Sequence, residues 1–515
     1  MPEDSAATAA VFALNAADVL IVAAGVAALL VVGFIAGRRE ADTRDFFLGG
    51  RRIPAWAVCL SFIATEVSAA TIVTVPAAAY GGNWNYLQMF IGSAVARIAI
   101  AFLFIPAFYR FDCTTIYEFL RDRFGPGTQY TASIFFFMTR LLASGVRLGV
   151  AALGTATIIG WGPSTTGNYA GVVVAIIVFT LVAIAFIAFG GIKAVVWTNV
   201  LQAIVFVAGG AATLIFLYHR IDGGFDAILA AAGPAKREVI RTYGGFADPW
   251  FLPAAALSGL LVNLTAFGTD QDFMQRLLTI ETRRASQRSL MGTIVIGLPV
   301  VILFLSIGTL LYVFHQQQPG AVKPMPGRTD DVLPLFVATV MPHALRGFLL
   351  LTILMASIDS PLGSLAASFV TDLYRPLIRR TASERHYLWV SRLSVAAFGV
   401  LLACVAFFMS HLERLLDVAF QVFCVTGGSL LGVFLLGLLT RSRGDFGNVV
   451  GMVAAVLVTG GLLFAGKYQF ALPFVGVPTL GWTWLIAVGT GVTLVVAFVL
   501  NLTLPARLDR FQRSP

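Results

Sequence analysis

Long hydrophobic segments alternate with short polar segments along nearly the whole chain. Thirteen of the hydrophobic segments approach the roughly 20 residues that a helix needs to cross the hydrocarbon core of a bilayer. The expected spans are Val19–Gly37, Ala55–Tyr80, Tyr86–Phe108, Thr131–Gly160, Tyr169–Phe189, Ala194–Tyr218, Phe251–Phe267, Leu290–Phe314, Leu345–Tyr374, Leu388–Phe408, Leu415–Leu439, Val449–Gly466 and Leu485–Leu502. The pattern predicts an all-α polytopic membrane protein with about 13 transmembrane helices.

The composition excludes most other classes of protein. Of the 515 residues, 58% are hydrophobic and 12% are charged, whereas soluble domains carry roughly 25% charged residues. The net charge of +9 requires no nucleic-acid partner, because membrane proteins concentrate Lys and Arg in cytoplasmic loops. The four cysteines and five histidines lack metal-ligand spacing, and the sequence contains no nucleophile or phosphate-loop motif. We therefore expect no enzyme.

Arginine clusters set the expected orientation. They follow the first, third, seventh, ninth, eleventh and thirteenth spans, and Lys193 follows the fifth. Because basic loops stay in the cytoplasm, the N-terminus is expected outside and the C-terminus in the cytoplasm. The expected location is the cell (inner) membrane. The outer connection 219–250 also carries basic residues, but long loops obey this rule poorly. The cytoplasmic segment Thr115–Gly125 has helical spacing and is expected to lie along the membrane surface.

One span carries a carboxylate at its middle. In Ala55–Tyr80, AWAVCLSFIATEVSAATIVTVPAAAY, Glu66 lies among Thr65, Ser68 and Thr71. A charge at that depth is costly unless it faces a cavity or a partner. The segment is therefore a candidate for part of a binding site.

Five ionisable residues lie well inside the expected spans. They are Glu66, Arg97, Arg140, Arg147 and Asp359. All except Arg140 fall near the middle of their spans, which fits either a shared polar cavity or two buried ion pairs that hold helices together. Arg140 is close enough to the cytoplasmic end to snorkel. The deeper Arg147 would either form a forked contact with a substrate carboxylate or neutralise Glu66.

The ninth span has a polar face. Ile353, Ala356, Ser357 and Ser360 are spaced to share one side of a helix, and Asp359 flanks that side. Hydroxyls, a carboxylate and backbone carbonyls would suit a monovalent cation that prefers oxygen ligands. Serine-rich faces in membrane helices also mediate close helix packing, but packing does not require a carboxylate.

Five stretches, taken in order, resemble the sodium/solute symporter family. They are DFFLGGRRIPAWAVCLSFIATEVSAAT (Asp45–Thr71), GGIKAVVWTNVLQ (Gly190–Gln202), GTDQDFMQRLLT (Gly268–Thr279), SIDSPLGSLAASFVTDLY (Ser357–Tyr374) and GGSLLGVFLLGLL (Gly427–Leu439). The resemblance implies a fold similar to that of the leucine transporter, with ten core helices in two inverted five-helix repeats. It also implies a first core helix that is broken at mid-membrane, for which TEVSAAT has suitable polarity and depth.

This resemblance divides the chain into five parts. Residues 1–54 hold the outer N-terminus, the first helix and a basic cytoplasmic loop. Residues 55–218 form the first repeat, 219–250 an outer loop and 251–439 the second repeat. Residues 440–515 add two further helices and the cytoplasmic C-terminus.

The family's common sodium site falls on backbone carbonyls and one hydroxyl. By resemblance, the Na+ ligands are the carbonyls of Ala64, Val67 and Ile353, together with Ala356 and Ser357. Ala356 departs from the family, where a hydroxyl residue is usual, so one side-chain oxygen would be missing.

A second sodium site is implied beside the first. Asp359 and Ser360 match one half of that site, while Asn199 stands where many members carry an acid. The negative charge would have moved from one helix to the other. A single coupling sodium remains the default expectation.

The resemblance also implies a substrate site around the broken helix. The implied contacts are Glu66, Ser68, Thr71, Phe90, Arg147, Asn263 and, by a looser match, Gln421. Phe90 replaces a polar residue of sugar-binding members, which argues against a sugar. Glu66 with Arg147 would suit a zwitterion, or a carboxylate if Glu66 is otherwise engaged.

The expected function is sodium-coupled import of a small organic solute by alternating access, with a carboxylate-bearing solute favoured. Two alternatives stay open. A buried Glu66 that holds a proton would admit a proton-coupled permease of the same fold, and a membrane sensor would bind solute without transporting it.

Overall fold

The computed structural model describes residues 14–38, 40, 42–162, 168–245, 248, 250–322, 329, 332–358, 361–411, 415–468 and 482–503. Within these residues every element of regular structure is helical, as the hydrophobic pattern predicts. In chain order the helices are α2 (Ala16–Ala36), α3 (Thr43–Leu48), η1 (Gly49–Arg51), α4 (Ala55–Glu66), α5 (Ala69–Gly81), α6 (Tyr86–Ala99), η2 (Ile100–Phe104), α7 (Ile105–Arg110), α8 (Ile116–Arg123), α9 (Pro126–Ile159), α11 (Ala170–Arg220), α12 (Gly224–Lys236), α13 (Leu252–Gly268), α14 (Gln271–Leu278), α15 (Arg283–Gln317), α16 (Val332–Thr339), α17 (Leu345–Ile358), α18 (Leu362–Ser368), η4 (Phe369–Ile378), α19 (Glu384–Ser410), α20 (Leu415–Leu439), α21 (Asp445–Tyr468) and α22 (Trp482–Thr503).

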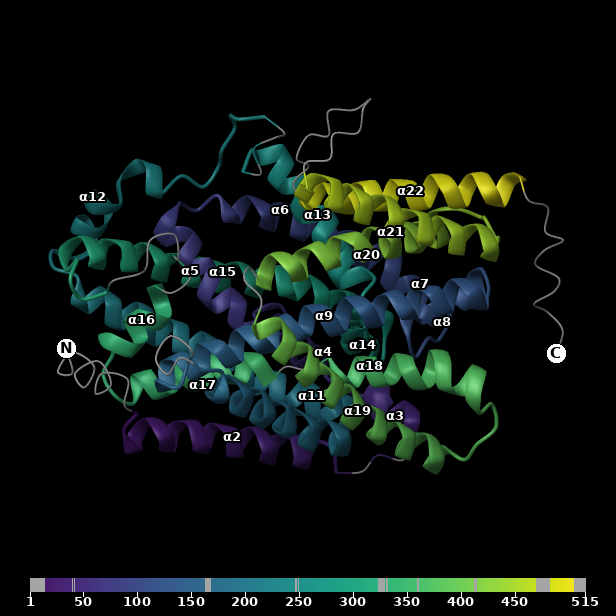
Figure 1. Cartoon of the computed structure of the whole chain (residues 1–515), viewed down its shortest axis with the longest axis horizontal. Coiled ribbons are helices and arrows are strands. Elements are labelled where there is room, and N and C mark those ends of the chain that lie inside the picture. The colour runs from purple at the N-terminus through teal and green to yellow at the C-terminus, as the bar shows by residue number, and fades with distance from the viewer. Residues whose placement is uncertain are drawn as a thin grey trace.

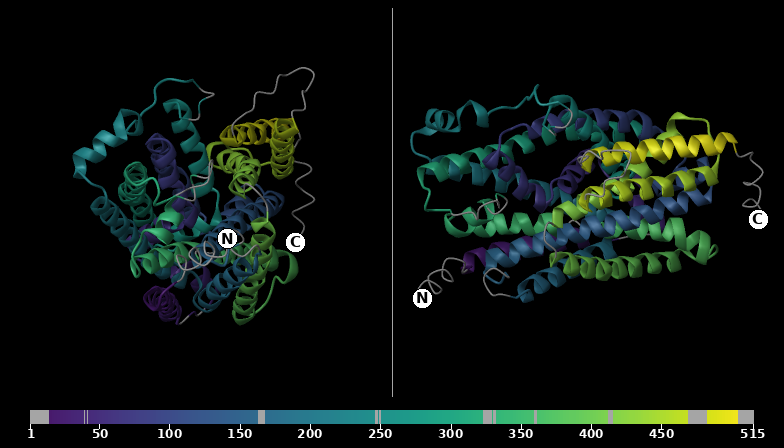
Figure 2. Two further views of the ribbon diagram at one scale, coloured as in Figure 1. Left: turned by 60° about the vertical axis from the view of Figure 1, so that its left-hand side comes forward. Right: turned by 45° about the horizontal axis from the view of Figure 1, so that its top comes forward.

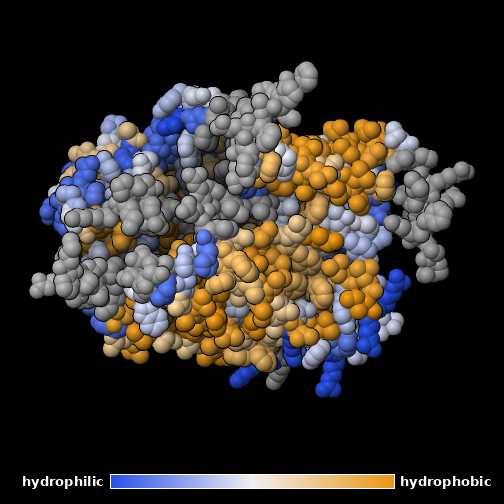
Figure 3. All heavy atoms as spheres, viewed as in Figure 1, coloured by the Kyte–Doolittle hydropathy of each residue, from blue (hydrophilic) through white to orange (hydrophobic). Residues whose placement is uncertain are grey.

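Each of the thirteen expected spans coincides with one or more of these helices. Among the described residues, eight helices are long and apolar enough to cross a membrane, or ten if each sharply bent pair is one span. The other three of the thirteen expected spans are accounted for by three helices. Helix α11 contains two expected spans, and α17 and α20 each contribute a shorter apolar stretch. Hydrophobic side chains form a broad band over the face seen in Figure 3, as a surface in contact with lipid requires.

Several helices are interrupted, and the interruptions have local causes. Helix α11 is kinked at Gly191, whose φ of 50° and ψ of −146° are accessible to glycine but strained for residues with a Cβ atom. Helices α13 and α14 meet at an angle of 63°. The second expected span is divided into α4 and α5 by Val67 and Ser68. These interruptions let backbone groups turn inward without facing lipid.

Most helices run along the long axis of the molecule (Figures 1 and 2). Helix α2 packs on α11 and α17 at one side, and α21 and α22 pack on α20 at another. Helices α3 and α8 lie at one end, and α12 and α16 lie at the opposite end (Figure 1). The end with α3, α8 and the side chains of Arg44, Arg121 and Arg375 is called the arginine-rich end below. The helix expected at Thr115–Gly125 is present there as α8, and its position along the membrane surface stays a prediction.

Candidate functional site

The break between α4 and α5 releases backbone carbonyl groups. The Ser68 N–H, which would bond the Ala64 carbonyl in a continuous helix, instead donates to the Glu66 carbonyl at 3.1 Å. The Thr71 N–H, which would bond the Val67 carbonyl, donates to Ser68 Oγ at 3.4 Å. The Ser68 and Thr71 side chains thereby form a capping box that starts α5. Two carbonyls at mid-span are left without their helical donors.

Glu66 forms an ion pair with Arg97 of α6. Arg97 Nη2 lies 2.5 Å from Glu66 Oε2, and the Arg97 side chain is completely buried while that of Glu66 is 29% exposed. Arg97 Nη1 also donates to Ser93 Oγ at 3.0 Å. The described ion pair of Glu66 is thus with Arg97 of α6, rather than with Arg147 as in one of the two alternatives that the sequence left open.

Two aromatic rings enclose the Arg97 guanidinium. Its Cζ atom lies 5.4 Å from the ring centre of Phe90 and 5.0 Å from that of Phe267. Such cation–π contacts strengthen when the cation is desolvated. Phe90, expected in the substrate site, thus contacts the partner of Glu66.

Arg147 of α9 contacts the residue before Glu66. Its Nη2 donates to the carbonyl of Thr65 at 3.2 Å. The Thr65 hydroxyl donates to the Ser61 carbonyl at 2.9 Å and accepts from Asn199 Nδ2 at 3.1 Å. Helices α9 and α11 therefore meet α4 one residue before Glu66. Thr65 was recognised only as a polar neighbour of Glu66, and its role as a junction was missed.

Asn263 and Gln421 make no described hydrogen bond with the residues of the break. Asn263 lies one turn before Phe267 on α13 and donates from Nδ2 to the Gly259 carbonyl at 2.7 Å. Gln421 is half-buried on α20, which meets α9 through the Thr139 and Thr426 hydroxyls at 2.5 Å. The described contacts do not join Gln421 to the break, so its substrate role stays a prediction.

The expected sodium ligands fall partly within the described residues. Ala64 and Val67 are buried at the break, and Ile353 and Ala356 are buried on α17, which packs on α5 and α9. The side chain of Ser357 and the whole of Asp359 and Ser360 lie outside the described residues. The sodium assignments therefore stay predictions.

A buried charge network lies between the break and the arginine-rich end. Arg140 Nη1 lies 3.3 Å from Asp270 Oδ2, and Arg140 Nη2 also pairs with Asp272. Asp272 Oδ1 in turn lies 2.7 Å from Arg276 Nη1. Arg140 was expected to snorkel towards the cytoplasmic end of its span. It is buried instead, because two carboxylates pair with it.

Sequence reasoning missed this network. Asp270 and Asp272 stand in the motif GTDQDFMQRLLT just beyond the expected seventh span, so they read as loop residues. All residues of α14, from Gln271 to Leu278, are buried. The network thus belongs to a packed layer in which α14 contacts α3, α4 and α8.

Comparisons with known proteins agree with this architecture. The profile described as Sodium:solute symporter family matches residues 46–455. The Sodium/sialic acid symporter SiaT of Proteus mirabilis is 28% identical over 475 residues, which cover 90% of this chain and 92% of that protein. Sodium-coupled monocarboxylate transporter 1 of Homo sapiens is 26% identical over 448 residues, which cover 84% of this chain and 70% of that protein.

Solved structures show the same fold. A Na+-coupled sialic acid symporter in a substrate-bound, outward-open state superimposes with a TM-score of 0.81 at 25% identity, over 95% of this chain and 98% of that chain. Mhp1, a nucleobase-cation-symport-1 family transporter, gives a TM-score of 0.53 at 13% identity, over 90% of this chain and 94% of that chain. The leucine-transporter-like fold implied by the resemblance is confirmed.

Proposed function

Because the chain belongs to the sodium:solute symporter family, we propose that it couples the entry of Na+ to import of a small organic acid through its carboxylate. The pairing of Glu66 with Arg97 carries this proposal. Because the buried Arg97 already neutralises Glu66, Glu66 does not need the ammonium group of a zwitterionic substrate as a partner. The second arginine at the break, Arg147, then supplies positive charge for a substrate anion.

The position of Arg147 suits a carboxylate. Its guanidinium reaches the last turn of α4 through the Thr65 carbonyl, and helix α5 begins three residues beyond Glu66. The N-terminus of α5 carries partial positive charge. A guanidinium presents five N–H donors in a planar fork that matches a carboxylate. Ser68 and Thr71 would add hydroxyl groups, with Phe90, Asn263 and Gln421 at the sides of the site.

We place Na+ beside the released carbonyl groups of the break. Ala64 and Val67 would supply two carbonyl oxygens, and Ile353, Ala356 and Ser357 the remaining groups from α17. Asp359 and Ser360 would form a second cation site. Oxygen ligands from broken helices are the usual means of holding Na+ in transporters of this architecture.

The names of the relatives favour an acid as substrate. Sialic acid and monocarboxylates both carry a carboxylate, and the two relatives that transport them align with most of this chain. In this proposal, the completely buried α14 covers the site from the cytoplasmic side. Alternating access would open that side after substrate and Na+ have bound. The N-terminus would then lie outside and the C-terminus in the cytoplasm.

The test is uptake by proteoliposomes under imposed gradients. Labelled sialic acid and short monocarboxylates are supplied with an inward Na+ gradient, an inward proton gradient at equal Na+, or neither. Accumulation that requires the Na+ gradient is expected. Accumulation that is driven by protons alone would support the proton-coupled permease, and saturable binding without accumulation would support the sensor.

A further inference from the structure

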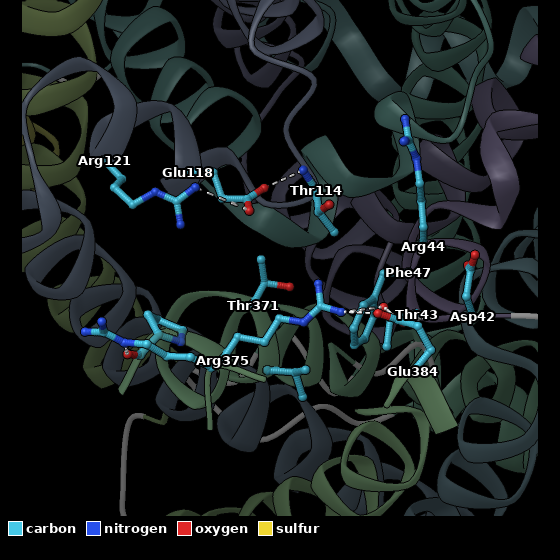
Figure 4. Close-up of a pocket in the computed structure, with 13 residues that line it drawn as sticks. Asp42, Thr43, Arg44, Phe47, Thr114, Glu118, Arg121, Thr371, Arg375 and Glu384 are labelled. Atoms are coloured by element: carbon cyan, nitrogen blue, oxygen red, sulfur yellow. Dashed lines mark hydrogen bonds and ion pairs between the residues drawn. The ribbon is translucent and has the colours of Figure 1, made fainter. Parts of the chain in front are cut away.

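A cavity of about 670 Å³ opens at the arginine-rich end, away from the break. Helix α3, helix α8, segment η4 and the start of α19 supply its walls, as Figure 4 shows. Four arginines line it, namely Arg44 of α3, Arg121 of α8, Arg375 of η4 and Arg380 of the loop after η4. The transport site described above uses none of these groups.

The acidic residues of the cavity are already engaged. Glu384 accepts from the Thr43 hydroxyl at 2.7 Å and pairs with Arg375 at 2.5 Å (Figure 4). Glu118 accepts from the Thr114 amide at 2.6 Å. Asp42 accepts from the Asp45 amide and so caps α3. Each of these three carboxylates thus has a partner within the protein, and the four arginines that line the cavity outnumber them.

The arginines retain hydrogen-bonding capacity. A guanidinium has five N–H donors. Within the described residues, Arg375 uses Nη2 for Glu384 and Thr43, and Arg380 uses Nε for the Pro376 carbonyl. Arg121 uses Nε for Asp122 and lies 3.9 Å from Glu118. The remaining donors suit the oxygens of a phosphate, which arginine binds through a planar fork.

Apolar side chains adjoin this basic cavity. Leu377 and Ile378 directly follow Pro376, which lines the cavity, and they are 59% and 66% exposed. A free phosphate ion would make no use of them, whereas the acyl chains of a lipid would cover them. Basic pockets beside apolar surface at the cytoplasmic side of a membrane bind anionic headgroups.

We propose that the cavity between α3, α8 and η4 binds the phosphate headgroup of an anionic phospholipid, with its acyl chains against Leu377 and Ile378. The bound lipid would join three elements that are far apart in sequence. One of them, α3, leads through η1 into the broken helix α4. The site is separate from solute and Na+ binding and does not depend on the proposed substrate.

Native mass spectrometry of the full chain tests the site. The protein is given equal amounts of phosphatidylglycerol and phosphatidylcholine with identical acyl chains. Preferential retention of phosphatidylglycerol is expected, and it should fall about fivefold for each arginine lost in the variant R121Q/R380Q. The matched variant R379Q/R385Q removes two exposed arginines that do not line the cavity, and it should retain the lipid like wild type.

Two further measurements separate a lipid from a free anion. The variant L377S/I378S should also lose phosphatidylglycerol, and inorganic phosphate should not displace the lipid at equal concentration. Equal loss in both arginine pairs, no preference between the two lipids, or displacement by phosphate would overturn the proposal. If R121Q/R380Q fails to fold, R380Q alone decides, because Arg380 is exposed and uses only one described hydrogen bond.

Discussion

Arg97 and Glu66 form an ion pair at 2.5 Å in the middle of the molecule, where α6 meets the break between α4 and α5. The arginine is completely buried and the glutamate is 29% exposed. The buried charge is therefore satisfied within the protein, while the carboxylate remains accessible beside the proposed substrate site. This geometry links the stability of the helix pair to the chemistry of the site.

Removing one member of this pair should destabilise the protein strongly. For Arg97→Met we expect a loss somewhat below the about 3–5 kcal/mol of a fully buried pair, since Glu66 is partly exposed. Arg97→Met combined with Glu66→Gln should recover part of the loss, because no unpaired charge remains. A double-mutant cycle measures this coupling. It compares the melting temperatures, in nanodiscs, of wild type, the two single variants and the double variant. Strictly additive effects would contradict coupling between the two residues.

Replacing Arg147 by lysine should impair recognition of a carboxylate. The charge is retained but the forked geometry is lost, so we expect kcat/KM for acid uptake to fall about tenfold, or about 1.4 kcal/mol. Arg220→Lys, a substitution at an exposed arginine at the end of α11, serves as the matched control. Uptake by Arg147→Lys that equals the control would assign Arg147 to a structural role, such as holding the Thr65 carbonyl, and not to substrate recognition.

Asp359 is the proposed side-chain carboxylate of the second cation site. Asp359→Asn removes its charge, so the Na+ concentration for half-maximal uptake should rise while the order of preference among substrates stays the same. Asp226→Asn, at an exposed position of α12, is the control. Sodium activation that is unchanged in Asp359→Asn would remove this residue from the ion site.

The positions of the helices were readable from the sequence, because lipid exposure imposes long apolar segments on the chain. The break at Glu66–Ser68 was also anticipated, since polar residues interrupt an otherwise apolar span and the family resemblance places a break there. The break follows from local sequence, in which Ser68 and Thr71 cap the second half-helix.

The partners of the buried charges were not readable in the same way. Which arginine meets Glu66 depends on how α4, α6 and α9 rotate about their axes, and hydrophobic patterns leave that rotation open. Asp270 and Asp272 were overlooked because the chain bends by 63° before α14 and returns them to the interior. Only the packed structure joins these carboxylates to Arg140.

The contact between α6 and α13 should depend on two glycines. A Cβ atom on Gly92 would clash with the Ala256 carbonyl, and one on Gly259 would clash with the Met89 carbonyl. Gly92→Ala and Gly259→Ala should each cost about 1–3 kcal/mol through overpacking. Gly460→Ala is the control, because a Cβ there meets no neighbouring atom within 4 Å, and it should be neutral or stabilising by up to about 1 kcal/mol. Equal melting temperatures for all three variants would contradict the close helix approach.

Glu40, in the connection between α2 and α3, should make stability depend on pH. Both carboxylate oxygens are buried without a hydrogen-bond partner among the described residues, and Oε1 lies 2.6 Å from the point that a Cβ on Gly191 would occupy. Burial raises the pKa of Glu40 to about 8, assisted by the charge of Asp45 and opposed by Lys193 and Arg392.

A carboxyl group whose pKa is raised by folding holds its proton more tightly in the folded state, so stability falls as the pH rises. For Glu40 the fall should extend from its ordinary pKa of 4.5 to about 8. Glu40→Gln should remove this dependence on pH. The stability of the variant should match that of wild type below this pH range and exceed it above the range. Melting temperatures across pH 4 to 9 measure the difference. The control is Glu281→Gln, at an exposed site between α14 and α15, whose melting temperature should change with pH as that of wild type does. A Glu40→Gln variant that loses stability relative to wild type as the pH rises would show that the Glu40 anion is stabilised in the folded protein.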